Sequence, residues 1–212
     1  MTKRISGLLA GVLLALPAFA GEIRVQARLL PDGQWQAREK QLITRAARIV
    51  FQRIATAKVA NCAYRNSFRE KKDVIRKIWS RQIPHLNKSR QVSIIIHRKK
   101  LGPGVLGRAK VGIAAIEPRF HRLENLEIDL SREQIHNHLQ KRGVGDTELW
   151  VNTIAHEVAH NFGHRHGAGG RWAGDYPGYF PTELGFCVMT DGRYGSDGGD
   201  LQKRRQWQRQ SR

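Results

Sequence analysis

The stretch HEVAHNFGHRH, residues 156–166, places four histidines and one glutamate within eleven consecutive positions. Residues four apart on an α-helix share a face, so His156 and His160 are expected to point the same way, about one turn apart. Two imidazoles at that separation can hold one Zn²⁺ ion with Zn–N bonds of ~2.0–2.1 Å. Glu157 then lies beside the ion without binding it, which is the position of a general base. The stretch therefore predicts a helix that carries a catalytic metal site.

A third ligand is expected where this helix ends. Gly163 lets the chain leave the helix in a conformation that residues with a Cβ resist, and His166 can then return to the ion. His164 is the alternative ligand, but it follows the glycine directly and has less chain with which to turn. Together with His156 and His160, His166 would leave a fourth position for water, as catalytic zinc sites do. The other interpretation of the stretch is a solvated polar helix end.

Hydrophobic periodicity along the rest of the chain predicts an α+β domain. Helices are expected over 37–57, 72–80, 132–141 and 147–162, and strands over 22–30, 92–97, 110–116 and 126–130. Glycines and a proline over 102–107 predict a loop, and the glycine-rich segment 163–199 is expected to be irregular because it shows little periodicity. The expected architecture is a mixed, twisted sheet backed by helices, with a long motif helix and a loop-rich C-terminal part.

The first twenty residues have the three regions of a secretory signal peptide. Lys3 and Arg4 give a positive start, residues 8–16 form an apolar run too short to span a bilayer, and Ala18-Phe19-Ala20 supplies a small-x-small cleavage site. A short membrane anchor or a buried helix is the alternative. No later stretch of the sequence is apolar enough to cross a membrane, so we expect a soluble protein that is periplasmic or secreted.

After a signal over 1–20, one domain is expected over 21–200, followed by a basic tail over 201–212 that is a short helix or disordered. The chain has a formal net charge of +19, and removal of Lys3 and Arg4 with the signal leaves +17. Such a surface attracts anionic polymers and surfaces, or it only maintains solubility. The sequence shows no nucleic-acid recognition motif, so specific nucleic-acid binding is not expected, and we expect a monomer.

Cys62 and Cys187 are the only cysteines of the chain. In an exported protein an even pair usually forms one disulfide, which here would tie an early segment to a late one. A free pair and an intermolecular bond are the alternatives. We therefore expect a disulfide between Cys62 and Cys187 that closes a long loop.

The pattern HExxHxxGxxH at 156–166 resembles the motif of the metzincins, a superfamily of zinc metallopeptidases. Metzincins also carry a methionine in a tight turn beneath the metal. Met189 lies 23 residues after His166, and the resemblance makes it the expected Met-turn residue, although a lone methionine is also a common core residue. Asn161, and Cys187 two residues before the methionine, look most like the adamalysin (reprolysin) branch.

The sequence departs from the metzincin families at two positions. Adamalysins have an aspartate after the third histidine, where this chain has Gly167. Astacins and serralysins have a tyrosine two residues after the methionine, where this chain has Asp191, so a tyrosine ligand is not expected. Cys62 as a latency ligand of the metal is an alternative to its place in the disulfide, and we favour the disulfide.

The resemblance implies a zinc endopeptidase in which a metal-bound water attacks the peptide carbonyl and Glu157 accepts its proton. It also implies that an extended substrate adds as a strand along an exposed edge, expected at Gly112, Ile113 and Ala114. Four aromatic residues are candidates for the wall of the cleft, or equally pack their own segment: Trp172, Tyr176, Tyr179 and Phe180.

Two other functions also fit the sequence. One is a binding protein that keeps the zinc fold and holds an anionic polymer through its basic tail. The other is a cell-wall peptide hydrolase that docks on an anionic wall. The presence of Glu157 argues against a pure binding protein, because such a protein needs no base beside the metal.

Overall fold

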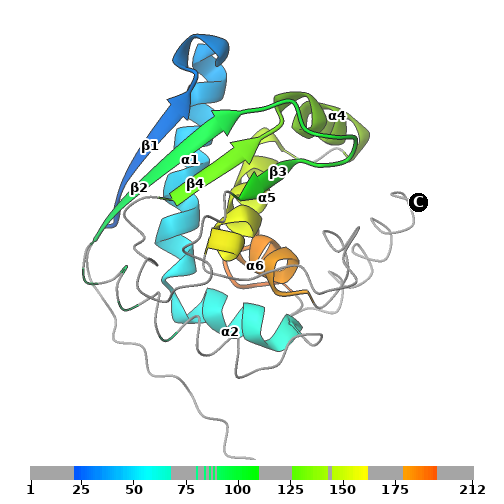
Figure 1. Cartoon of the computed structure of the whole chain (residues 1–212). Coiled ribbons are helices and arrows are strands. Elements are labelled where there is room, and N and C mark those ends of the chain that lie inside the picture. Colours follow the sequence, from blue (N-terminus) through cyan, green and yellow to red (C-terminus); the bar gives the residue numbers. More distant parts are fainter. Residues whose placement is uncertain are drawn as a thin grey trace, which may run out of the picture.

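A mixed sheet of four strands organises the fold (Figure 1). The computed structural model describes residues 22–67, 90–109, 126–142, 145–161 and 179–194, together with residues 80, 84, 86 and 88. The strand order is β1-β2-β4-β3, with the bounds Arg24–Leu30 (β1), Gln91–Arg98 (β2), Leu126–Leu130 (β4) and Gly107–Ala109 (β3). The first three strands are parallel, and β3 runs antiparallel to β4 at the edge of the sheet. The expected α+β class with a mixed sheet is therefore confirmed.

One face of the sheet is apolar and packs on helices. Alternate residues of a strand point to the same face, and β2 shows this most clearly because Val92, Ile94 and Ile96 are buried while their neighbours are more exposed. The buried apolar residues of the two central strands are Val92, Ile94, Ile96, Leu126, Ile128 and Leu130. Helix α1, Ala37–Ile54, lies against β1, and helix α5, Asp146–Asn161, lies against β3 and β4, while the two helices pack on each other (Figure 1). The motif helix therefore lies at the sheet edge that β3 forms.

The helix expected over 37–57 is interrupted, and sequence reasoning missed the helix that follows. Helix α2 covers Ala57–Asn66. Thr56 causes the break, because its hydroxyl donates to the Arg53 carbonyl at the end of α1 (2.7 Å) and accepts the Val59 N–H at the start of α2 (3.4 Å).

The prediction of an irregular segment over 163–199 was wrong for ten of its residues, which form helix α6, Phe180–Met189. Almost every side chain of α6 is buried. A helix that is buried all round lacks the polar stripe on which periodicity depends, so residues 180–189 carry no helical periodicity. Gly185 brings α6 close to α5, since a Cβ at this glycine would lie 3.0 Å from the Asn152 backbone oxygen.

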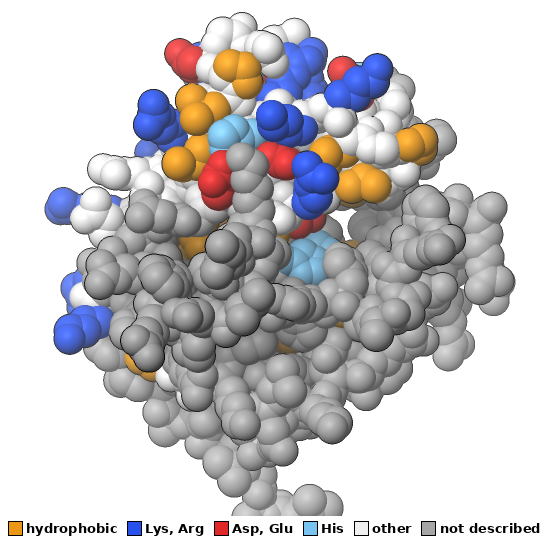
Figure 2. Space-filling model, in the orientation of Figure 1, with side chains coloured by type: hydrophobic (Ala, Val, Ile, Leu, Met, Phe, Trp, Pro, Cys, Tyr) orange, Lys and Arg blue, Asp and Glu red, His pale blue; other side chains and the backbone are white. Residues whose placement is uncertain are grey.

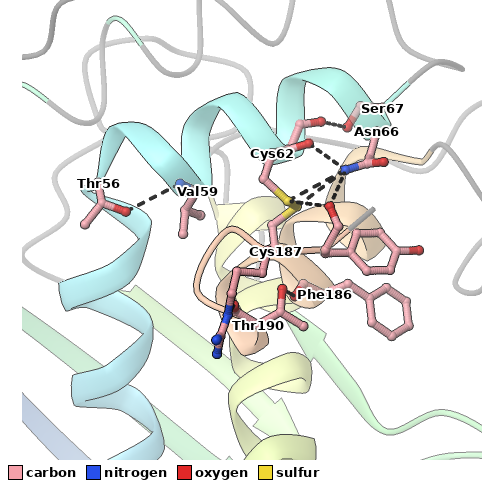
Figure 3. Close-up of a disulfide and its surroundings, with 11 residues drawn as sticks. Thr56, Val59, Cys62, Asn66, Ser67, Phe186, Cys187 and Thr190 are labelled. Carbon is pink, nitrogen blue, oxygen red and sulfur yellow. Dashed lines mark hydrogen bonds between the residues drawn. A yellow bond between two sulfur atoms is a disulfide. The ribbon is translucent and has the colours of Figure 1, made fainter. Parts of the chain in front are cut away.

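The predicted disulfide joins Cys62 of α2 to Cys187 of α6 across 125 residues (Figure 3). Both cysteines are fully buried. The side-chain amide of Asn66 donates to the Cys62 carbonyl (2.9 Å) and to the Tyr194 carbonyl (3.3 Å) beside the bond. The disulfide is therefore confirmed, and it attaches α6 to a helix from the first third of the chain.

The turn that follows α6 is held against α1 and α2. Arg53 donates to the Val188 and Met189 carbonyls at 2.9 and 2.8 Å. Asp191 pairs with Lys58 and lies 3.7 Å from the Arg53 guanidinium. These contacts and the disulfide fix the end of α6 in place.

The outer face of the sheet, away from α1 and α5, is polar. His97 Nε2 lies 2.5 Å from Glu127 Oε1, which joins β2 to β4. Arg108 of β3 pairs at 3.0 Å with Asp129 of β4, whose side chain is only 1% exposed. Figure 2 shows basic and acidic side chains beside one another over the strands. The short edge strand is thus attached to the sheet by an ion pair as well as by its backbone.

The remaining elements follow the sequence closely. The strands expected over 92–97 and 126–130 are β2 and β4, the strand expected over 22–30 is β1, and the motif helix is α5. A 3₁₀ turn, η1, Asp32–Gln34, leads into α1. Helix α4, Arg132–Arg142, begins after Ser131, whose hydroxyl accepts the Gln134 N–H (3.5 Å).

Several expectations lie outside the described residues. They concern the signal over 1–20, residues 72–79 of one expected helix, the strand over 110–116 and the tail over 201–212. None of the helices in the described part of the chain has the length and apolar content needed to cross a bilayer.

Candidate metal centre

Helix α5 presents the two predicted histidine ligands on one face near its C-terminal end. His160 is 5% exposed, and His156 is partly exposed. Their Nε2 atoms lie 3.2 Å apart, and their rings meet edge to face with centroids 5.0 Å apart. The structure therefore brings the tips of both imidazoles to one point.

The separation of these two nitrogens fits a shared zinc ion. Two Zn–N bonds of ~2.0–2.1 Å that meet at a tetrahedral angle place their nitrogens ~3.3–3.4 Å apart. The same distance also suits a hydrogen bond from one ring to the other, in which one Nε2 carries a proton. Loss of that proton leaves two lone pairs directed at the same point, which is what a metal requires.

The third ligand is not among the described residues. His166, its alternative His164 and the helix-ending Gly163 all lie outside them. Within the described part of the chain, no group of three or more His, Cys, Asp or Glu side chains has a metal-binding arrangement. His156 and His160 are therefore the part of the predicted ligand set that the structure places.

Glu157, the predicted base, is 5% exposed and lies against β3. Burial raises the pKa of this carboxyl from 4.5 to about 8; a backbone hydrogen bond from Ala109 and the charge of Arg108 lower it, and the charge of Asp129 raises it. A divalent cation beside the carboxyl would lower its pKa. A group whose pKa lies near neutral pH is suited to accept and return a proton during a reaction.

Strand β3 makes contacts with Glu157 that sequence reasoning did not identify. A Cβ at Gly107 would lie 2.8 Å from both Cγ and Oε1 of Glu157, so the strand passes directly over this carboxyl group. Ala109 of the same strand supplies the backbone hydrogen bond. Gly107 was assigned to a loop, although a glycine inside a strand often marks the close approach of another group.

The predicted cleft-wall residues separate into two kinds. Tyr179 is buried beside the histidine pair, with its ring centroid 6.3 Å from that of His156 and 6.4 Å from that of His160. Phe180 is fully buried in the core, so it packs its own segment. The other two candidates, Trp172 and Tyr176, lie outside the described residues.

Met189 is the last residue of α6, and a turn follows it directly. Its side chain is partly buried against the core, and α6 packs on the motif helix. Its place beneath a metal stays a prediction. The predicted substrate edge, Gly112, Ile113 and Ala114, lies outside the described residues, and β3 precedes it in the chain.

The end of the motif helix is tied to the sheet by Asn161. Its side-chain amide donates to the Glu157 carbonyl (3.2 Å) and to the Glu127 carbonyl of β4 (3.4 Å). This contact holds the last turn of α5, which carries His160, against the strand next to β3.

Comparison of the chain with protein-family models, with curated protein sequences and with solved structures finds no match. The resemblance to the metzincins therefore depends on the motif residues. The case for a catalytic site depends on the convergence of His156 and His160 on α5 and on the contact of Glu157 with β3.

Proposed function

We propose that this chain is an exported zinc endopeptidase of the metzincin type. The observation that carries the proposal is the convergence of the His156 and His160 Nε2 atoms to 3.2 Å, on the helix that also carries the buried carboxyl group of Glu157. A solvated polar helix end would leave these side chains in water, whereas His160 and Glu157 are each 5% exposed. The disulfide supports export, because such bonds persist in oxidising compartments.

The ligands of the ion would be His156 and His160 of α5, with His166 as the third. When bound, Zn²⁺ makes water a nucleophile near neutral pH and polarises the scissile carbonyl. Glu157 accepts the proton of the attacking water and delivers it to the leaving amine. The hydrogen bond from Ala109 holds the Glu157 carboxyl in place before the reaction, so little reorganisation is needed during it.

The outer edge of β3 is the described surface best placed for an extended substrate. The Leu106 carbonyl accepts the Ser131 N–H (2.9 Å) and so faces β4. Backbone groups alternate along a strand, so those of Gly107 and Ala109 face the opposite edge. The hydrogen bond from Ala109 to Glu157 agrees with this orientation. A peptide that added as a strand at this edge would pass the base, with little dependence on its sequence.

The proposal is tested by cleavage of an unstructured protein such as casein by the wild type and Glu157→Gln. Loss of a general base lowers kcat by ~10²–10⁴-fold, and the zinc content of the variant should be retained. Glu148→Gln is the matched control, because Glu148 is an exposed glutamate at the start of the same helix. Chelator should abolish cleavage and added zinc should restore it. Equal rates for the wild type and Glu157→Gln would refute the assignment of the base.

The same proteins separate the two other functions. Steeply salt-dependent binding to an anionic polymer that survives Glu157→Gln, without any cleavage, would indicate a binding protein. Cleavage confined to cell-wall peptides would indicate a wall hydrolase. Cleavage of casein by the wild type supports the general endopeptidase.

A further inference from the structure

Gly107 opens strand β3, and the side chain of Glu157 lies directly against it. We propose that Gly107 is a positioning residue for Glu157: its missing Cβ leaves the space in which the Glu157 carboxyl group lies against the β3 backbone. The catalytic consequence of this contact rests on the proposed peptidase function, but the contact itself does not.

The need for glycine at this position is steric. A Cβ built on Gly107 would lie 2.8 Å from Cγ and Oε1 of Glu157 and 3.1 Å from Cδ, and these are its three nearest atoms. The backbone at position 104 has a φ of +74°, a conformation that favours glycine. The φ at position 107 lies outside this left-handed region, so the backbone there does not itself require glycine. An alanine at 107 would therefore be tolerated by the backbone, and the three atoms nearest to its Cβ would all belong to the Glu157 side chain.

The strand has little freedom to retreat from an added methyl group. Arg108 pairs with Asp129 at 3.0 Å on the outer face, and Asp129 is 1% exposed. The Ser131 N–H donates to the Leu106 carbonyl (2.9 Å) directly before β3. Because both flanks of Gly107 are attached to β4, the group that must move is the Glu157 side chain.

A displaced carboxyl group would lose its hydrogen bond from Ala109 and its position against the β3 backbone. Proton transfer depends strongly on such placement, and a misplacement of ~1 Å lowers the rate by ~10²-fold. The histidines would keep their positions, because the three nearest atoms to a Cβ at Gly107 all belong to Glu157. Zinc content and substrate binding should therefore change little.

A double-mutant cycle on the zinc-loaded full chain, expressed into an oxidising compartment, tests the contact without any assay of activity. Gly107→Ala should lower Tm by ~2–10 °C in the wild type, the range for overpacking a buried site in a chain of this size. In the Glu157→Ala background it should change Tm by less than ~2 °C. Gly102→Ala is the matched control, because a Cβ at Gly102 meets nothing within 4 Å.

An equal fall of Tm in both backgrounds, or no fall in the wild type, would overturn the contact. A Gly107→Ala chain that does not accumulate in folded form, beside a double variant that does, supports it. For the catalytic role, Gly107→Ala should lower kcat by ~10²-fold with KM changed less than ~3-fold and zinc retained. Unchanged kcat, or lost zinc, would overturn the positioning role. If the wild type cleaves nothing, the proposed function fails, and the cycle still decides whether Gly107 positions Glu157.

Discussion

Removal of the Cys62–Cys187 disulfide is expected to lower the free energy of unfolding by about 5 kcal/mol. The bond closes a loop of 125 residues. The chain-entropy relation for a loop of that length gives a change of ~16 cal/mol/K in the unfolded chain, or ~5 kcal/mol at 25 °C. In a chain of this size 1 kcal/mol shifts Tm by ~2–4 °C, so Tm should fall by ~10–20 °C.

The double variant Cys62→Ala/Cys187→Ala, followed by thermal unfolding of the zinc-free protein, measures this quantity. Reduction of the wild type is the control, because it removes the bond and leaves both side chains in place. Both samples should show the fall, and the variant should fall further since its buried sulfur atoms are also lost. A fall of less than ~2 °C in both samples would show that the stability of the fold does not depend on the link between α6 and α2.

Three further substitutions test local contacts. Arg53→Lys should lower Tm by ~2–6 °C, because one ammonium cannot replace the guanidinium that donates to the last two carbonyls of α6. Arg48→Lys is the control and should leave Tm unchanged, because Arg48 is exposed. Gly185→Ala should destabilise by ~1–3 kcal/mol although alanine usually favours a helix, because its Cβ would lie 3.0 Å from the Asn152 backbone oxygen; a higher Tm would contradict the close packing of α5 and α6. In zinc-free protein burial raises the pKa of Glu157 to about 8, so the stability that its proton confers is complete below pH 4.5 and is lost as the pH rises through 8. The change in Tm that Glu157→Gln causes in zinc-free protein should therefore be more favourable at pH 8 than at pH 4. Equal changes in Tm at the two pH values would contradict the burial of this carboxyl.

Elements with strong local signals were predictable from the sequence. The motif helix has acidic residues in its first turn, β2 contains a run of β-branched residues, and β4 alternates apolar and acidic residues. The pairing of Cys62 with Cys187 followed from the count of cysteines in a chain that the sequence predicts to be exported. For the site, helical spacing alone predicted that His156 and His160 meet.

Features that depend on tertiary contacts were not predictable. The buried helix α6 has no polar stripe, and the break at Thr56 depends on one hydroxyl that serves two helices. The contact between Gly107 and Glu157 joins residues 50 positions apart, and nothing local to either residue indicates the other. The sequence thus predicted that the two histidines meet on α5, and the structure adds the strand that lies against Glu157.

The most direct test of the proposed zinc site is the number of zinc ions bound per chain, measured by elemental analysis of the wild type, His156→Ala and His136→Ala. His136 is an exposed histidine of α4 outside the motif, so it is the matched control. If His156 is a ligand, the wild type and His136→Ala should each bind one zinc, and folded His156→Ala should bind less than ~0.1 zinc. Stoichiometric zinc in His156→Ala, or none in the folded wild type, would contradict the proposed zinc site.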